Sequence, residues 1–415
     1  MTLVTGRSLS GKTALISQAY SDKPFLYFSL SGKTEALQTE EYVAQVRRKL
    51  DIHVSRTVLN FRLLMDYLFK VSSMNPMTIV LEDFDELLRR NPDYFAVLKS
   101  LWRSRRSTHV NLVLTISNPL NVAKIFDDPQ APLLNTLDMK INLGFLSLAQ
   151  IKAEMTATGK SWVNEDLLTM YMLTGGCPKY VSYSTQRGIV KRADLLREFL
   201  CHGSVWLADI RMMVAESLGH NSEVYLSLLQ LIASGVRSQG ELEERLGGII
   251  VGGHLAKLEN DYCLITKTRP VLAGAKSRNV VRYEFTDQMT ECWFRYAEAL
   301  RDCIETGDFE MVTKIMDNDL PIYSKDVLRR YFRQKFVEEN GFREIGGDWK
   351  AGKESVFEMD IVGVDRDHGH ALLADVELSS DRFRKDPFLE RCAALRDGPL
   401  KGYSVDTMLF TLNDM

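Results

Sequence analysis

One stretch near the start of the chain constrains its fold more than any other. Residues 6–13 read Gly-Arg-Ser-Leu-Ser-Gly-Lys-Thr, and apolar residues stand on both sides of them, at 3–4 and at 14–16. This spacing of two glycines and a Lys-Thr pair is the phosphate-loop pattern, which needs a strand before it and a helix after it. The sequence therefore predicts a strand–loop–helix unit that binds the phosphates of a nucleoside triphosphate.

Each position of the loop has a chemical role. The glycines let the backbone curl, so its N–H groups point inward and meet a phosphate together with the positive end of the helix that follows. Lys12 supplies a positive charge for the β- and γ-phosphates, and the Thr13 hydroxyl is a ligand for Mg²⁺. We expect ATP or ADP, with Mg²⁺, to be held by Gly6, Arg7, Ser8, Leu9, Ser10, Gly11, Lys12, Thr13 and Ala14.

A second motif has the pattern of an acid-ended strand that works together with such a loop. The apolar run at 77–81 ends in Glu82 and Asp83. One carboxylate at a strand tip can hold Mg²⁺ through water, and a second can orient the attacking water. We assign Glu82 to the metal shell and Asp83 to the water. Such strands usually end in Asp-Glu, and because the order is reversed here we expect slow hydrolysis.

Further apolar runs at 24–30, 110–116 and 140–143 alternate with helical patterns over 38–72 and 92–105. Strands that alternate with helices predict a parallel α/β sheet whose site lies at the C-terminal ends of the strands. Ser117 and Asn118 stand at one such end, so they are further candidate site residues.

The length and composition of the chain limit its possible domain number, partners and compartment. A chain of 415 residues is too long for one core, so we expect about two to four domains. The net charge of −3 means that any nucleic-acid surface must be local. The six cysteines form no C-x-x-C pair, which fits a reducing compartment, and no apolar run approaches a membrane span. We expect a cytoplasmic protein without a membrane partner.

The middle of the chain reads as helices over 147–216, followed by a predicted winged helix over 222–287. The expected wing is basic and free of acids, and its cations are Lys267, Arg269, Lys276, Arg278 and Arg282. Such a wing can meet DNA phosphates. The expected recognition helix is mostly small and apolar, which is poor for reading bases. DNA binding through 267–282 and a protein-docking or intramolecular role both stay open.

These motifs, taken with Gly175-Gly176-Cys177-Pro178, resemble the archaeal-type ATPases of the STAND branch of the AAA+ proteins, which also occur in bacteria. The resemblance implies a P-loop NTPase parallel sheet (1–146), a helical lid (147–216), a winged helix (217–300), and linker helices with a C-terminal α/β nuclease-like domain (301–415). It also implies that Ser117 senses the γ-phosphate and that Pro178 contacts the nucleotide. Family members usually carry an adenine-contacting segment before the loop. Here the first strand follows Met1 directly, so base selectivity is less secure than phosphate binding.

The C-terminal part resembles a restriction-endonuclease-like core. Such a core has a helix Glu, a strand Asp and then Glu/Asp-x-Lys, whose acids bind Mg²⁺ and whose lysine assists the attacking water. Asp360 and Asp375 match this pattern, but Glu377 stands at the lysine position and Arg329 at the helix-Glu position. We therefore expect no nuclease activity. The two aspartates either bind metal weakly or are simply solvated.

Three functions remain after these observations. The first is an ATP-binding switch with slow Mg²⁺-dependent hydrolysis. The second is a DNA-binding regulator or DNA-processing protein that uses the wing and the nuclease-like domain. The third is a nucleotide-gated scaffold that binds a protein partner or a second copy of itself without turnover.

Overall fold

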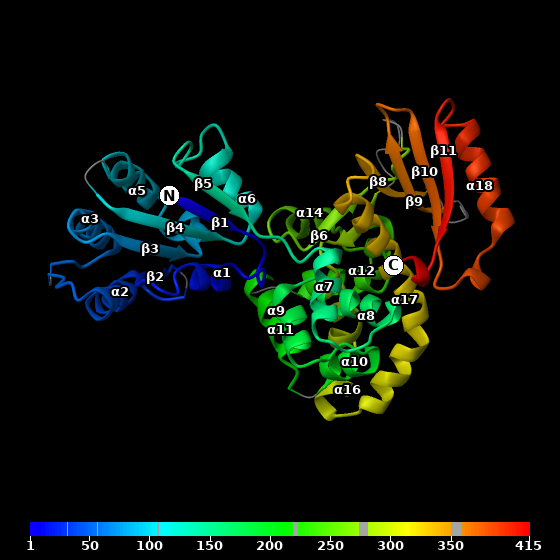
Figure 1. The fold of residues 1–415 in the computed structure, drawn as a ribbon, viewed down its shortest axis with the longest axis horizontal. Helices are drawn as coiled ribbons and strands as arrows, with labels where there is room; N and C mark the ends of the chain where they lie inside the picture. The colour runs from blue at the N-terminus through cyan, green and yellow to red at the C-terminus, as the bar shows by residue number, and fades with distance from the viewer. Residues whose placement is uncertain are drawn as a thin grey trace. The chain divides into compact units, whose positions relative to one another are not determined.

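The computed structural model describes residues 1–30, 32–55, 57–105, 108–201, 203–218, 223–273, 281–349 and 358–415. The chain forms two compact units, Met1–Gly144 and Phe145–Met415, which we call unit 1 and unit 2 (Figure 1). Within the described residues, no helix has both the length and the apolar character of a membrane span.

Unit 1 alternates strands with helices, as the sequence predicts. Its elements are β1 (Thr2–Thr5), α1 (Lys12–Ala19), β2 (Phe25–Ser29), α2 (Glu35–Leu50), α3 (Phe61–Val71), β3 (Met77–Glu82), the 3-10 turn η1 (Phe84–Glu86), α4 (Leu87–Arg90), α5 (Asp93–Arg103), β4 (Val110–Ile116), α6 (Pro119–Val122), the π-helical turn η3 (Ala123–Asp127) and β5 (Met139–Asn142).

The five strands form one parallel sheet in the order β2-β3-β4-β1-β5. This confirms the predicted parallel α/β core. The strand before the phosphate loop, β1, and the acid-ended strand, β3, are separated by β4 alone. Because the carboxyl ends of parallel strands meet at one edge, the loop, the acids and the end of β4 share that edge.

Alternation along the strands divides the side chains between two faces of the sheet. Leu3, Leu81 and Leu114 belong to the large core that includes residues of α2, α3 and α5. Val4, Val80 and Val113 pack instead with Ile16 of α1. The sheet is thus covered on both faces, as parallel sheets require. Side chains two residues further along these strands than Val4, Val80 and Val113 share their face, and so they also point toward α1.

The helical pattern predicted over 38–72 is interrupted. The structure has two helices there, α2 and α3, with a break between Leu50 and Phe61. Asp51 ends α2 in the left-handed conformation, with φ of 52°. Asn60 begins α3, where its side chain accepts a hydrogen bond from the Leu63 N–H. Apolar periodicity continues across the break because both helices face the same core, so the pattern alone did not reveal it.

Unit 2 begins with a helical segment, followed by three helices and a two-stranded antiparallel hairpin. Its elements to this point are α7 (Leu148–Ala157), α8 (Asn164–Thr174), α9 (Pro178–Gln186), α10 (Arg192–Leu200), α11 (Val205–Leu218), α12 (Glu223–Ala233), α13 (Gln239–Arg245), α14 (Gly252–Asn260), β6 (Ile265–Thr268) and β7 (Arg282–Phe285). This order of elements suits a winged helix, but that assignment and the predicted domain boundaries stay predictions.

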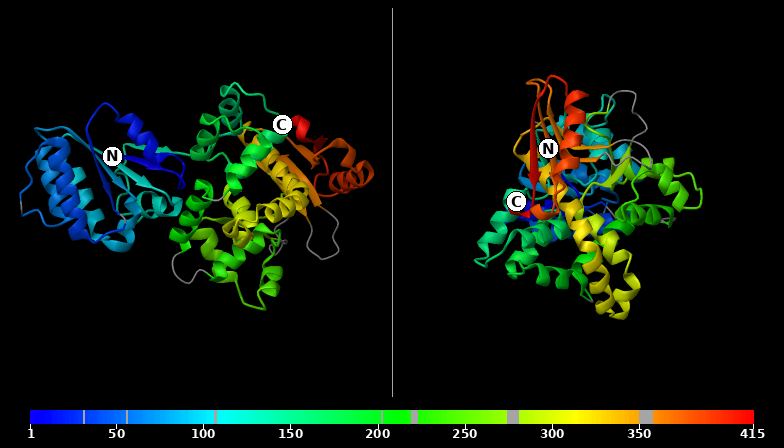
Figure 2. Two further views of the ribbon diagram at one scale, coloured as in Figure 1. Left: turned by 90° about the horizontal axis from the view of Figure 1, so that it is seen from below. Right: turned by 90° about the vertical axis from the view of Figure 1, so that its right-hand side faces the viewer.

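The remainder of unit 2 carries a mixed sheet in the order β11-β10-β9-β8. Its later strands are the orange and red arrows of Figure 2. Only β10 and β11 pair in parallel, and α17 and α18 both pack against the sheet. The elements are α15 (Gln288–Cys292), the π-helical turn η4 (Trp293–Glu298), α16 (Arg301–Thr306), α17 (Phe309–Glu338), β8 (Glu344–Trp349), β9 (Glu358–Asp365), β10 (His370–Val376), the 3-10 turn η5 (Ser380–Arg382), α18 (Lys385–Asp397), β11 (Ser404–Phe410) and the 3-10 turn η6 (Leu412–Asp414).

The strand β8 was not predicted. It contains Gly346 and Gly347, and glycine is disfavoured in strand interiors unless another group approaches closely. Here a Cβ on Gly347 would lie 2.5 Å from an Arg333 guanidinium nitrogen. Gly347 therefore makes room for an arginine of α17, which sequence periodicity does not reveal.

Candidate functional site

The backbone of the predicted phosphate loop depends on its two glycines. A Cβ on Gly6 would lie only 2.3 Å from the Leu143 carbonyl oxygen, so no larger residue fits there. Gly11 has φ of 91°, in the left-handed region that favours glycine, and the helix α1 starts directly after it. The loop therefore turns tightly from β1 into the N-terminus of α1.

The side chain of Lys12 folds back onto this loop and contacts its backbone. Its Nζ donates hydrogen bonds to the carbonyl oxygens of Gly6, at 2.7 Å, and Arg7, at 3.0 Å. Burial lowers the pKa of Lys12, while the nearby Asp83, Glu82 and Asp85 act in the opposite direction. These contacts place a cation between the loop and the acids.

Thr13 and Glu82 meet at the start of α1. The Thr13 hydroxyl donates to Glu82 Oε1 over 3.2 Å. Glu82 follows Val80 at an interval of two along β3, so it points toward the face covered by α1. The structure thus brings together the two residues that the sequence assigns to a metal shell.

Asp83 follows in the left-handed conformation, with φ of 53°. Its N–H donates to Thr115 Oγ1 over 3.2 Å, which ties the turn after β3 to β4. Ser117 is partly buried directly after β4. Asn118 caps α6 by accepting from the Leu120 N–H over 2.9 Å, which is a structural role. Glu82, Asp83 and Ser117 therefore lie at one edge of the sheet.

Sequence reasoning missed two residues at this edge. The Tyr27 hydroxyl on β2 donates to Glu82 Oε1 and lies 3.4 Å from Thr13 Oγ1. Asp85 accepts from Asn121 Nδ2 at 2.8 Å, and burial raises the pKa of Asp85. The apolar run that contains Tyr27 has no sequence signal that singles out its hydroxyl.

The residues present fit a nucleotide with Mg²⁺. Thr13 and Glu82 offer the oxygen ligands that Mg²⁺ prefers. The Ser10 Oγ is buried at the loop and has no hydrogen-bond partner among the described residues, so it is a donor that a phosphate oxygen would satisfy. Lys12 supplies the cation.

Gly175, Gly176 and Pro178 have clear structural roles in unit 2. Gly175 ends α8 with φ of 55°. A Cβ on Gly176 would lie 2.5 Å from the Leu146 carbonyl oxygen. Pro178 occupies the first turn of α9, where its missing N–H has no cost. The predicted contact between Pro178 and a nucleotide stays a prediction.

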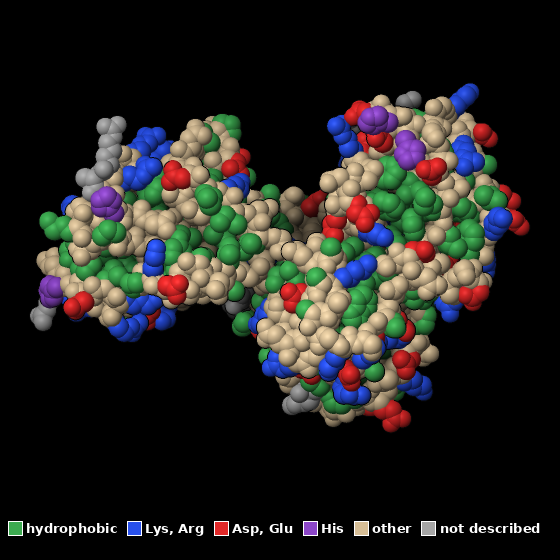
Figure 3. All heavy atoms as spheres, in the orientation of Figure 1, with side chains coloured by type: hydrophobic (Ala, Val, Ile, Leu, Met, Phe, Trp, Pro, Cys, Tyr) green, Lys and Arg blue, Asp and Glu red, His purple; other side chains and the backbone are tan. Residues whose placement is uncertain are grey.

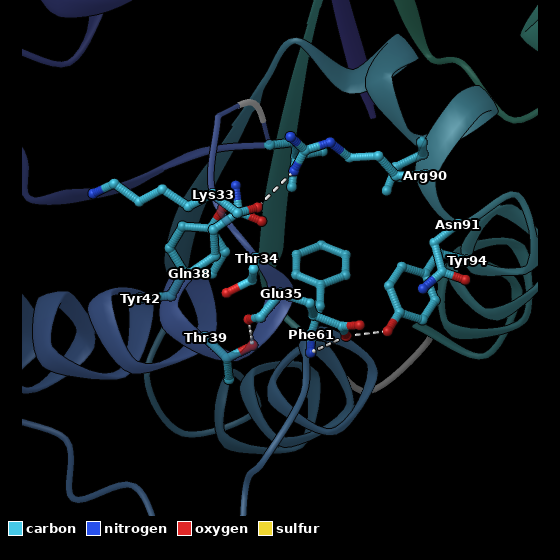
Figure 4. Close-up of a pocket in the computed structure, with 12 residues that line it drawn as sticks. Lys33, Thr34, Glu35, Gln38, Thr39, Tyr42, Phe61, Arg90, Asn91 and Tyr94 are labelled. Carbon is cyan, nitrogen blue, oxygen red and sulfur yellow. Dashed lines mark hydrogen bonds between the residues drawn. The ribbon is translucent and has the colours of Figure 1, made fainter.

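A separate pocket of about 320 Å³ lies beyond the end of β2 and is lined by residues between 30 and 94 (Figure 4). Glu35 accepts hydrogen bonds from the Phe61 N–H, at 3.1 Å, and from the Tyr94 hydroxyl. Arg90 closes the opposite side by donating to the Lys33 carbonyl oxygen over 2.8 Å. The lining contains no phosphate-loop residue, so this pocket is distinct from the predicted nucleotide site.

The predicted wing packs partly on the C-terminal sheet. Arg282 donates to Glu358 Oε1 at 2.8 Å and lies 4.4 Å from the Trp349 ring centroid. The Val271 N–H donates to the Gly347 carbonyl oxygen over 3.0 Å. Lys267 pairs with Glu259 at 3.3 Å, whereas Lys276 and Arg278 lie outside the described residues. Figure 3 shows basic and acidic side chains intermixed over the visible face.

In the predicted nuclease-like core, each acid has a cationic partner. Arg329 lies 2.8 Å from Asp360 Oδ1, and Lys325 Nζ lies 2.6 Å from Glu377 Oε1. The third acid, Asp375, accepts from a guanidinium nitrogen of Arg391. Within the described ranges, no three His, Cys, Asp or Glu side chains form a metal-binding group. Arg329 therefore lies beside Asp360 at the position where the nuclease pattern has a glutamate, and its charge is opposite to that of a glutamate.

The parallel sheet of unit 1 and its glycine-rich loop match the fold of a P-loop NTPase core. The Walker-type ATPase paby2304 of Pyrococcus abyssi is similar over 71% of this chain and 90% of its own, at 16% sequence identity and a TM-score of 0.53. The ORC2 protein of Aeropyrum pernix, in ADPNP and ADP complexes, matches 74% of this chain and 88% of its own at 11% identity, with a TM-score of 0.45. No protein-family model and no curated protein matches the sequence. The similarity to the Pyrococcus protein shows a shared fold.

Proposed function

We propose that the protein is a nucleotide-dependent switch of the STAND/AAA+ type that binds ATP with Mg²⁺ in unit 1 and hydrolyses it slowly. The observation that carries this proposal is the pairing of Thr13 with Glu82, 3.2 Å apart, beside a glycine-dependent loop. A structural turn alone would not need an ammonium group, a hydroxyl and a carboxylate at the same sheet edge. Unit 2 then responds to the nucleotide.

Each residue has a defined task in this proposal. The loop N–H groups and the α1 N-terminus hold the phosphates, and Lys12 binds the β/γ region. Thr13 and Glu82 hold Mg²⁺, which, when bound, neutralises phosphate charge. Asp83 orients water, and Ser117 senses the γ-phosphate. The positive charge of Lys12 also offsets the negative charges of Glu82 and Asp83, which would otherwise repel an anionic ligand.

For unit 2 we propose a nuclease-like shape without nuclease chemistry. The pairing of Asp360 with Arg329 supports this, because a guanidinium that already neutralises the acid competes with a metal ion. The DNA-binding alternative stays a prediction, since Lys267 and Arg282 already have acidic partners within the chain. A protein partner or a second copy also stays open.

Changing Asp83 to Asn tests the hydrolytic part of the proposal. A neutral amide cannot accept a proton from water, so steady-state ATP turnover should fall at least about tenfold while ATP affinity stays within about threefold. Phosphate release by the full chain, with and without added DNA, measures both the loss and any DNA stimulation.

Asp66→Asn is the matched control for this experiment. Asp66 belongs to the same unit but pairs only with the exposed Lys70 at 2.6 Å, in the part of the chain that the structure describes. Its turnover should equal that of the wild type. Equal turnover in Asp83→Asn and wild type would remove Asp83 from the mechanism, and DNA-dependent turnover would favour the DNA-directed alternative.

A further inference from the structure

Tyr27, on the edge strand β2, forms a cluster with the two proposed metal-shell residues. Its hydroxyl donates to the same Glu82 oxygen, Oε1, that accepts from Thr13 at 3.2 Å. The Tyr27 and Thr13 oxygens are themselves 3.4 Å apart. One carboxylate oxygen therefore lies between a tyrosine hydroxyl and a threonine hydroxyl.

The register between β2 and β3 places Tyr27 beside Glu82. Tyr27 pairs with Val80 of β3, and Ser29 pairs with Glu82. Leu26 and Phe28 are fully buried in the large core, so Tyr27 between them points to the opposite face, where α1 lies. A tyrosine on that face, two residues before the end of β2, reaches the carboxylate at the end of β3.

The backbone of Tyr27 is held on its outer side as well. Because β2 is an edge strand, the N–H and C=O of Tyr27 that face away from β3 need partners. Gln45 of α2 supplies both. Its Oε1 accepts from the Tyr27 N–H at 2.6 Å, and its Nε2 donates to the Tyr27 carbonyl oxygen at 2.9 Å. The phenol is thus carried by a backbone that is fixed on both sides.

The direction of the phenol hydrogen bond follows from the chemistry of its acceptor. A glutamate carboxylate oxygen only accepts, so the Tyr27 hydroxyl donates this hydrogen bond to Glu82 Oε1. Hydrogen bonds to an ionised acceptor are stronger than neutral ones.

We infer that Tyr27 is a positioning residue that holds the Glu82 carboxylate beside Thr13 for Mg²⁺ binding. This inference rests on the proposed function. Strands of this kind usually carry Asp where Glu82 stands, and glutamate has one more rotatable bond. A fixed hydroxyl donor removes that extra freedom before Mg²⁺ arrives, so less ordering is left for the binding step.

Mg²⁺ dependence of nucleotide affinity tests the inference in the full chain. A fluorescent ATP analogue is titrated at a series of Mg²⁺ concentrations and in EDTA. In Tyr27→Phe, the Mg²⁺ concentration that gives half of the maximal affinity gain should rise about fivefold, as expected for the loss of one hydrogen bond of typical net strength. Affinity in EDTA should stay within about twofold of wild type, because the loop residues are unchanged.

Tyr20→Phe is the matched control. It makes the same chemical change at the other end of α1, where the Tyr20 hydroxyl accepts from Asn111 Nδ2 at 2.7 Å. Its Mg²⁺ response should match that of the wild type. In a Glu82→Gln background, adding Tyr27→Phe should cause little further change, since both variants remove the same ion–dipole contact.

The outcomes separate the two claims. A wild-type chain without Mg²⁺-sensitive, Lys12-dependent binding would overturn the proposed function and this inference with it. A wild-type chain that binds as proposed, beside a Tyr27→Phe variant with an unshifted Mg²⁺ response, would overturn the inference alone. An equal loss of affinity in EDTA and in Mg²⁺ would also overturn it, because that pattern indicates damage to the fold.

Discussion

Replacing Lys12 with alanine is expected to reduce ATP affinity by at least about 100-fold, the loss of one or two charge-assisted hydrogen bonds to phosphate. The effect is large for two reasons. The ammonium group contacts the loop carbonyls of Gly6 and Arg7, so it is already placed where the phosphates would lie. Glu82, Asp83 and Asp85 also act on it electrostatically, and without this cation they would repel the phosphates.

Isothermal titration of the full chain with ATP and Mg²⁺ measures this loss. Lys23→Ala is the control, because Lys23 is exposed in the turn after α1 and outside the loop. Its affinity should equal that of the wild type. Undiminished ATP affinity in Lys12→Ala would refute the site assignment.

The second large effect concerns the stability of unit 2. Arg330 of α17 pairs with Glu291 of α15 at 2.6 Å, and the two side chains are only 16% and 3% exposed. Arg330→Met leaves a buried carboxylate without its partner, so the free energy of unfolding should fall by about 3–5 kcal/mol. Urea denaturation followed by tryptophan fluorescence is a suitable measure, because Trp102 alone among the five tryptophans lies outside unit 2.

The pH dependence of this loss has a definite sign. Burial already raises the pKa of Glu291 above its ordinary value, although Arg330 opposes the shift. Without Arg330 the native state binds a proton on Glu291 more readily than the unfolded chain does. The destabilisation should therefore be full at neutral pH and shrink as the pH falls toward the ordinary carboxyl range.

Two further variants show whether the buried pair is the cause. Arg197→Met removes an exposed arginine whose partner is Asp194 at 3.1 Å, and it should cost less than about 1 kcal/mol. Combining Arg330→Met with Glu291→Met replaces both charges by apolar groups and should recover most of the loss. A double variant no more stable than Arg330→Met would show that the carboxylate is not responsible.

Local patterns predicted the elements that depend on local chemistry. The motif at Gly6–Thr13 and the acids at the end of β3 are short local patterns. A phosphate-binding loop must curl within a few residues, and metal-binding acids of this kind stand at a strand tip. Those constraints act within about ten residues, so they are visible in the sequence. The parallel sheet followed from apolar runs that alternate with helical patterns.

Long-range pairing was not predictable in the same way. Tyr27 reaches Glu82 only because β2 and β3 pair in one particular register. Arg282 reaches Glu358 across 76 residues of the chain, and no periodicity links them. Lys325 of α17 donates to Glu377, the residue that stands at the lysine position of the expected nuclease pattern. Each of these contacts is set by packing between elements.

The most direct test of the central claim compares the affinities of ADP and AMP for the wild-type chain in Mg²⁺. If Gly6–Ala14 holds the ligand by its β-phosphate, ADP should bind at least about tenfold more tightly than AMP, because only ADP places a phosphate against the loop N–H groups and Lys12. Equal affinities for the two nucleotides would contradict phosphate recognition by this loop.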